Sequence, residues 1–240
     1  MSTTSPNLGT YQTNTTALLQ NPPAPSTLYA TANINTYINT ARAQIAGTGL
    51  CVRSTGTLTT VANTRAYNLS SLTLSPSSGI GGPFLINQLQ VAIGTGQRWM
   101  RPRQYQWLYL YRLSVAVPPT GMPVEWSQEL QGITGNFVVD PLPDNAYTLS
   151  ADVFCYPSDL ASNTDPESIP YPWTDCVPYF AAYIALLSAQ RSTDADKMFE
   201  RYKMFEQRAR AMSTPPVMPG IYPQQPDIFM PSRLGMKGGG

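Results

Sequence analysis

The 240-residue sequence contains no histidine, only 12% charged residues and three cysteines, and each shortage excludes a class of chemistry. Without histidine, neither a catalytic pair of Ser or Cys with His nor a zinc site of Cys and His can form. Cys51, Cys155 and Cys176 include no C-x-x-C pair, so we expect them to be reduced and structural. We therefore expect no metal and no cofactor.

The sequence also lacks any apolar run of the roughly 20 residues that a membrane-spanning helix needs. Its first residues have neither the basic region nor the apolar stretch of a secretory signal, so we expect a soluble product made in the cytoplasm. No Gly-rich phosphate loop followed by Lys and Ser or Thr is present, and no calcium-binding loop.

The few charges are sorted by sign along the chain, although the net charge is only +1. Residues 1–124 contain seven arginines and no acidic residue, whereas residues 125–175 contain nine acidic residues and no basic one. Two explanations stay open. The two blocks either neutralise each other within one subunit or make complementary, head-to-tail contacts between copies.

Helical periodicity marks both ends of the sequence. Residues from about 27 to 46 predict an amphipathic helix that stops at two glycines. A second helix is predicted from a cap at Thr174 or Asp175 to about Gln190, and a third from Ser192 to the prolines at 215–216. The turn between the last two is short, so we expect them to pack antiparallel and against the first helix. The predicted buried stripes are Leu28, Ala32, Tyr37, Ala41 and Ile45; Tyr179, Ala182, Tyr183, Leu186 and Leu187; and Met198, Tyr202, Phe205, Ala209 and Met212.

The middle of the sequence has the alternation and the composition of strands, with Gly, Pro or Asn between several of them. Strands are predicted near residues 50–53, 57–61, 65–69, 84–93, 124–129, 136–139 and 147–154. Residues 103–114 fit a strand or a short buried helix, and the spacing of Trp107, Leu110 and Tyr111 favours the helix.

These patterns predict an α+β fold. A helical bundle forms from the N-terminal helix and the C-terminal helix pair, with an inserted β-rich domain, a sandwich or small barrel, and extended terminal arms. The predicted organisation is an extended N-terminal arm at 1–26, a bundle helix at 27–49, a β-rich insertion at 50–170, a helical hairpin at 171–214 and an extended C-terminal arm at 215–240.

Two groups of residues are candidates for contacts with partners. The C-terminal arm has too many isolated hydrophobic residues for a solvated linker, so we expect it to order against a partner or a neighbouring subunit. Its candidate contact residues are Tyr222, Ile228, Phe229, Met230 and Arg233. Arg98, Arg101 and Arg103 lie among aromatic residues, a mixture suited to a DNA path or to ion pairs between subunits.

Catalysis has weaker support in the sequence. Glu125, Glu129, Asp140 and Asp144 could supply the two carboxylates of a glycosidase. Acidic residues flanking prolines, as in residues 140–144, are more often turn formers than catalysts. We therefore assign no catalytic residue and expect a protein that is not an enzyme.

Several segments resemble the head-to-tail adaptor, or connector, proteins of short-tailed bacteriophages. The resemblance covers most of residues 30–215 and is strongest at WTDCVPYFAAY, residues 173–183. The other segments that carry it are NINTYINTARAQIAG at 33–47, TRAYNL at 64–69, GMPVEW at 121–126, DPLPD at 140–144, YTL at 147–149, IP at 169–170, ADKM at 195–198, Tyr202 and RAR at 208–210.

The resemblance implies a structural virion protein that forms a ring of twelve copies between the portal and the tail components. It also implies that double-stranded DNA passes through the lumen of this ring during ejection. The alternatives are a tail-tube, nozzle or decorating subunit, a tail-associated cell-wall hydrolase acting through Glu125 or Asp140, and a carbohydrate-binding module. The last would leave the C-terminal helix pair without a purpose.

Overall fold

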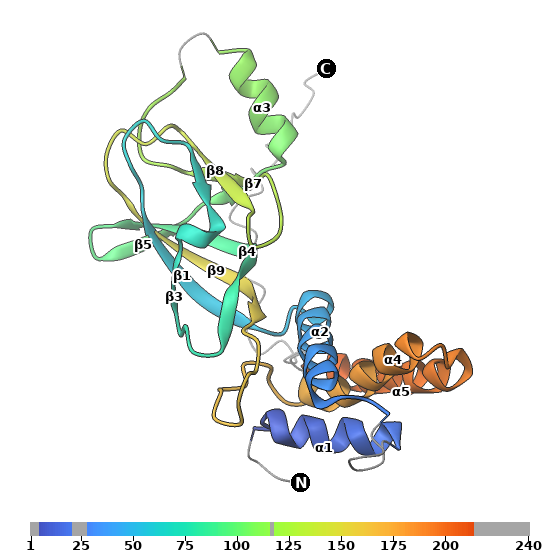
Figure 1. Ribbon diagram of the computed structural model, residues 1–240. Coiled ribbons are helices and arrows are strands. Elements are labelled where there is room, and N and C mark those ends of the chain that lie inside the picture. The colour runs from blue at the N-terminus through green and yellow to red at the C-terminus, as the bar shows by residue number, and fades with distance from the viewer. Residues whose placement is uncertain (1–4, 21–27, 116–117, 214–240) are drawn as a thin grey trace, which may run out of the picture.

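The computed structural model describes residues 5–20, 28–115 and 118–213, and it places a helical bundle and a β-rich part at opposite ends of an elongated molecule (Figure 1). The helices are α1 (Leu8–Leu19), α2 (Thr31–Gly49), α3 (Tyr105–Leu113), α4 (Val177–Ser188) and α5 (Ser192–Ser213). The strands are β1 (Arg53–Thr59), β2 (Ala66–Asn68), β3 (Thr73–Ser75), β4 (Ile80–Ile93), β5 (Gly96–Trp99), β6 (Arg101–Pro102), β7 (Glu125–Gln128), β8 (Asn136–Asp140) and β9 (Thr148–Pro157). The predicted α+β class, with helices from both ends of the chain flanking a β-rich middle, is confirmed.

The β-rich part consists of two sheets with the strand orders β3-β1-β9-β4-β5 and β2-β8-β7-β6. Strand β9 pairs antiparallel with β1 and β4, and every second residue from Leu149 to Cys155 is buried. Phe137 and Trp126 of the smaller sheet belong to the same buried cluster. The sequence pattern located β2, β4, β7, β8 and β9. The two strands predicted at 50–53 and 57–61 are a single strand, β1, because the residues between them pair with β9 as well. Strands β3, β5 and β6 were missed, since at three, four and two residues they are too short to show a period.

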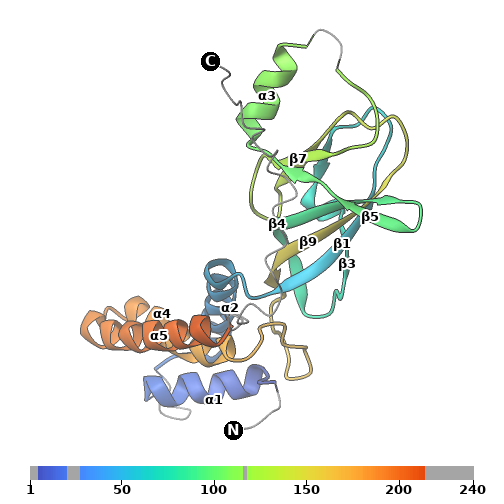
Figure 2. The same cartoon turned by 180° about the vertical axis from the view of Figure 1, so that it is seen from behind.

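The helical bundle is built around the antiparallel pair that the sequence predicts. Ring contacts follow opposite orders along the two helices: Tyr179 stacks on Phe205 with centroids 4.7 Å apart, and Tyr183 stacks on Phe199 at 4.8 Å. Helices α2 and α1 both pack against α4, and two opposite views show all four helices in one group (Figures 1 and 2).

The buried stripes differ from the predicted ones at their edges. In α2 the buried apolar residues include Ile34 and Ile38, whereas Leu28 precedes the helix and is exposed, as is Ala32. Leu187 and Met212, predicted to be buried, are also largely exposed, and each lies in the last turn of its helix. The cap predicted for α4 was wrong. Residues 173–176 form a 3₁₀ turn, and Cys176 takes the cap position without a side-chain hydrogen bond.

Helix α1 occupies residues for which the sequence predicted an extended arm. The side chain of Asn7 accepts a hydrogen bond from the backbone N–H of Thr10 and caps the helix. Its buried residues, Leu8, Tyr11, Thr15 and Leu19, recur at spacings of three and four, as one helix face requires. The Thr- and Asn-rich composition has low helix propensity, and the packing of this face against α2 and α4 outweighs it.

Two connections join the bundle to the β-rich part. Helix α2 leads directly into β1, and residues 158–172 lead from β9 back to the bundle. Helix α2 also packs against β9, so the β-rich part is inserted between helices that meet in space. The exact residue bounds predicted for each domain remain a prediction.

Candidate interaction surfaces

Helix α3 exposes most of its apolar side chains to solvent. Only Leu108 is buried, at 1% exposure, whereas Leu110 and Leu113 are 64% and 69% exposed. The helix sits on an excursion between β6 and β7 and projects from the end of the molecule opposite the bundle (Figure 1). The predicted helix is thus confirmed. The expectation that it is buried is wrong, because α3 packs against β7 on one side and its other sides face solvent.

The exposed aromatic rings of α3 are ordered by stacking against each other. Trp107 and Tyr111 stack with centroids 5.5 Å apart and an interplanar angle of 1°, and Tyr105 stacks on Tyr109 at 6.2 Å. The guanidinium of Arg103 lies 4.8 Å from the ring centre of Trp107. Together with Leu110 and Leu113, these rings form what we call the α3 surface. Contiguous exposed apolar area of this kind marks an interaction site more often than a solvated face.

The three arginines proposed for partner contacts have two different environments. Arg103 donates two hydrogen bonds to Oε1 of Glu125, at 2.7 and 3.0 Å, and this hydrogen bonding raises the pKa of Arg103. Arg98 and Arg101 are exposed and line a pocket of about 450 Å³ with Trp99 and Glu125. Neither makes an ion pair with any residue in the described part of the chain. Only these two therefore keep a guanidinium available for a partner.

The sorted charges largely neutralise each other inside one subunit. Four of the seven arginines in the first block pair with acids of the second block. The pairs are Arg42 with Glu167, Arg53 with Asp152, Arg65 with Asp140 and Arg103 with Glu125. Of the two explanations left open by the sequence, the structure therefore favours the internal one for these four arginines.

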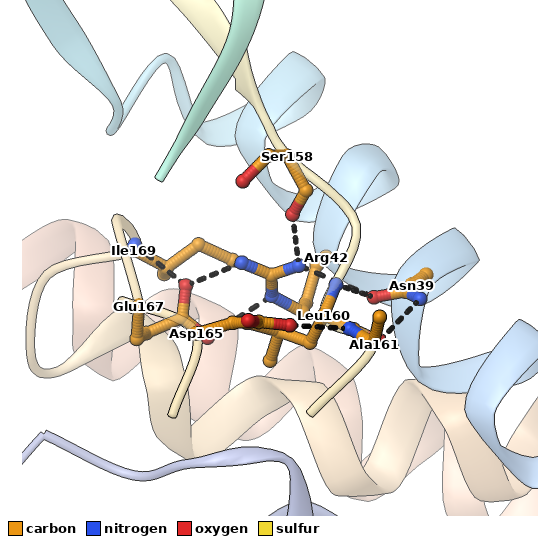
Figure 3. Close-up of polar contacts among 8 residues, drawn as sticks. All are labelled: Asn39, Arg42, Ser158, Leu160, Ala161, Asp165, Glu167 and Ile169. Atoms are coloured by element: carbon orange, nitrogen blue, oxygen red, sulfur yellow. Dashed lines mark hydrogen bonds and ion pairs between the residues drawn. The ribbon is translucent and has the colours of Figure 1, made fainter. Parts of the chain in front are cut away.

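The pair of Arg42 and Glu167 differs from the others because both side chains are fully buried (Figure 3). The Arg42 guanidinium donates to both carboxylate oxygens of Glu167, at 2.8 and 3.0 Å, and to the backbone oxygen of Ser158 at 2.6 Å. It also donates to Oδ1 of Asn39, which accepts from the backbone N–H of Leu160. Such a pair tolerates burial only because its donors and acceptors are satisfied.

This buried network holds the segment between β9 and α4 onto α2. Glu167 also accepts from the backbone N–H of Ile169, so contacts reach the segment at both of its ends. Between them, Asp165 accepts from the backbone N–H groups of Ser162 and Ala161, and these hydrogen bonds lower the pKa of Asp165. The network thereby fixes how the inserted part joins the bundle, a role that no sequence pattern indicated.

Two of the four carboxylates considered for catalysis, Glu125 and Asp140, are engaged by arginines, whereas Glu129 accepts a hydrogen bond from Asn136 and Asp144 accepts one from Tyr147. Glu125 accepts from Arg103, and Asp140 lies 3.6 Å from Arg65 and is almost fully buried. The two residues face each other across β7 and β8. Each therefore has a structural partner that accounts for its position.

The cysteines are free, as expected, among the residues that the structure describes. Burial raises the pKa of Cys51, Cys155 and Cys176 to about 12 in each case, so their thiols are poor nucleophiles near neutral pH. No group of three potential metal ligands occurs within residues 5–20, 28–115 and 118–213. In these same ranges, every helix is too short or too polar to cross a bilayer.

The candidate residues of the C-terminal arm, Tyr222, Ile228, Phe229, Met230 and Arg233, lie outside the described residues. Their role therefore stays a prediction.

A comparison with known families decides what kind of protein carries these surfaces. The sequence model of one family, described as SU10 adaptor protein, matches residues 6–221. The chain belongs to this adaptor family. It is a structural protein of the bacteriophage virion and a head-to-tail connector, so the resemblance found in the sequence is confirmed. No individually curated protein matches the adaptor chain.

Proposed function

We propose that the adaptor forms a ring, of twelve copies, between the portal and the tail, and that this ring lines the conduit through which the genome is ejected. The observation that carries the proposal is the α3 surface in a member of an adaptor family. A subunit with such a surface is incomplete as a monomer, and a closed ring covers one patch per copy by repeating a single heterologous contact.

The charge distribution also supports a conduit. Each contact between a basic side chain and a phosphate adds salt-sensitive affinity for DNA, and that affinity would hinder ejection. The net charge is only +1, and four arginines pair with acids of their own subunit, so few basic side chains are available to bind DNA phosphates. We propose that Arg98 and Arg101 face either the DNA path or an acidic neighbour, and that Arg103 supports Trp107 of the α3 surface.

In this proposal the α3 surface contacts the neighbouring copy, and the C-terminal arm contacts the portal or a neighbouring copy through Tyr222, Ile228, Phe229, Met230 and Arg233. The subunits are made in the host cytoplasm and assemble there. The protein has no catalytic role, and its remaining partners are tail nozzle or fibre proteins.

The test is assembly of the purified chain with its cognate portal, measured by sedimentation velocity and by electron microscopy of the resulting particles. The wild-type chain should form closed rings docked to the portal. The double variant Leu110→Ser/Leu113→Ser should stay monomeric or assemble with at least about tenfold weaker affinity, since each lost apolar contact weakens association.

A matched control changes exposed apolar residues outside the α3 surface. Val61 and Ile93 are also exposed, so Val61→Ser/Ile93→Ser should leave assembly unchanged. A wild-type chain that stays monomeric with the portal at all concentrations would overturn the ring proposal. If both double variants assemble equally well, the α3 surface does not contribute to the contact between subunits.

A further inference from the structure

A cleft of about 540 Å³ separates the C-terminal half of α2 from the β-rich part. Its walls include Gln44, Gly47 and Thr48 of α2, Phe84 and Tyr156 of the larger sheet, and Gln131 of the β7–β8 connection. The rings of Phe84 and Tyr156 stack with centroids 4.4 Å apart, and no charged side chain lines the cleft. The surface is thus aromatic and uncharged, with amide groups at its sides.

The described part of the chain ends beside this cleft. The hydroxyl of Ser213, the last residue of α5, accepts a hydrogen bond from the indole N–H of Trp173 at 2.8 Å. The Trp173 ring lies against Gly49, where an added Cβ would come within 2.7 Å of it. One turn earlier in α5, Arg210 donates to the backbone oxygen of Thr48, a residue of the cleft, at 3.1 Å. Chain that leaves α5 therefore starts at the end of α2 that borders the cleft.

The sequence that follows α5 is proline-rich and uncharged, which suits an aromatic, uncharged cleft. Residues 214–226 contain five prolines and no charge. Seven extended residues span roughly 23 Å, enough to run along the cleft. Proline-rich segments lose little entropy on binding, pack against aromatic rings and leave their backbone groups free for side-chain amides such as those of Gln44 and Gln131.

Two further observations favour this pairing. The family match extends to residue 221, eight residues beyond the end of α5, so this stretch belongs to the shared family pattern and not to an appended tail. The second pocket, by contrast, is lined by Arg98, Arg101 and Glu125. Covering those charges with an uncharged segment would cost desolvation without any compensating pair.

We propose that residues 215–221 occupy this cleft in their own subunit, as a strap that links α2 to the β-rich part. The strap adds a third connection between the two parts, besides the α2–β1 junction and the segment held by Arg42 and Glu167. Residues from Tyr222 onward then leave from the β-rich side of the cleft toward a partner. This contact needs neither a ring nor a portal, so it stands apart from the proposed function.

The first test is cross-linking in the full-length chain with a cysteine in the cleft, Gln131→Cys, and one in the strap, Val217→Cys. The native thiols react slowly because burial raises their pKa to about 12. With a short bismaleimide at low protein concentration, the pair should form a link within one chain. Its yield should exceed that of the control pair Gln97→Cys/Val217→Cys by about fivefold, because the strap holds one cysteine at high effective concentration. Equal yields, or a product that joins two chains, would overturn the proposal.

The second test compares two truncations by hydrogen exchange. Removal of residues 214–240 should raise exchange about threefold at the amides of Gln44–Thr48 and of Gly132, since a covering segment is lost. Removal of residues 222–240 keeps the strap and should leave these amides unchanged. The same exchange in both truncated chains would contradict the strap.

Discussion

Helices α4 and α3 are both short, apolar and rich in aromatic rings, yet their environments differ. Helix α4 is enclosed by α1, α2 and α5, and its small residues Ala181, Ala182 and Ala185 are fully buried. Helix α3 contacts β7 and exposes its tryptophan, two of its three tyrosines and two of its three leucines. Small residues allow close approach of neighbouring helices, whereas large rings in α3 are available to a partner. Similar composition thus serves the subunit's own core in one helix and assembly in the other.

The largest expected effect on stability lies at the buried ion pair of Arg42 and Glu167, beside the enclosed helices of the bundle. Replacing Glu167 by Ala leaves the Arg42 charge buried without its partner, which should lower the free energy of unfolding by about 3–5 kcal/mol. Chemical denaturation measures this loss. The double variant Arg42→Met/Glu167→Leu is the control and should regain much of the stability, because it removes both charges. If Glu167→Ala unfolds like the wild-type chain, the network does not hold the bundle.

A charge in the α4–α5 contact should have the next largest effect. Phe205 is half-buried and stacks on Tyr179, so Phe205→Asp should destabilise the bundle by about 2–4 kcal/mol through burial of an unpaired charge. Thermal unfolding followed by circular dichroism measures the change. Met204→Asp, at an exposed position of the same helix, is the control and should shift the midpoint little. An unchanged midpoint for Phe205→Asp would show that this face does not pack against α4.

Asp152 provides a smaller, pH-dependent effect in the β-rich part. Burial alone would raise the pKa of Asp152, but hydrogen bonds from Arg53 and Asn87 outweigh it and lower the pKa below the usual value of an aspartate. A carboxyl with a lowered folded-state pKa stabilises the protein above its unfolded pKa, and that stability is lost as the pH falls through the folded pKa.

Asp152→Asn should therefore cost roughly 0.2–1 kcal/mol at neutral pH, since Arg53 is largely exposed. The difference from the wild-type chain should disappear in acid, as denaturation across a pH series would reveal. Asp159→Asn, at an exposed carboxylate, is the control and should change the free energy of unfolding little at neutral pH. A cost for Asp152→Asn that persists unchanged below the folded pKa would contradict the ion pair.

The smallest effect on stability is expected for an exposed leucine of α3, Leu110, and the buried Leu108 of the same helix provides the comparison. Leu110→Ser should change the free energy of unfolding by less than about 0.5 kcal/mol, because the side chain is exposed in the subunit. Leu108→Ala should cost about 2–5 kcal/mol, since the Leu108 side chain is almost fully buried. Urea denaturation of both variants tests the comparison. Equal costs would mean that α3 does not lean on β7 as described.

The fold could be predicted where a local pattern is long enough to show a period. The ring-bearing faces of α4 and α5 and the alternation of β9 are such patterns, and both were located correctly. The segment at α1 was predicted as extended because the first 25 residues carry no charge and end in a proline-rich run, although Leu8, Tyr11, Thr15 and Leu19 carried the helical spacing. Arg98 and Arg101 are exposed, and Arg103 is hydrogen-bonded to Glu125 of its own subunit, which no local pattern indicated. The roles assigned to these arginines in DNA or subunit contacts stay a prediction.

By itself, the sequence determined the class of the fold, the resemblance to phage adaptors and the exclusion of histidine chemistry, since these depend on residue types and local spacing. Only the tertiary structure decided which charges pair, because Arg42 and Glu167 are separated by 125 residues and meet only when the segment after β9 returns to α2. The same holds for α3. A helix face is apolar by sequence, but its exposure depends on whether another element of the chain folds over it.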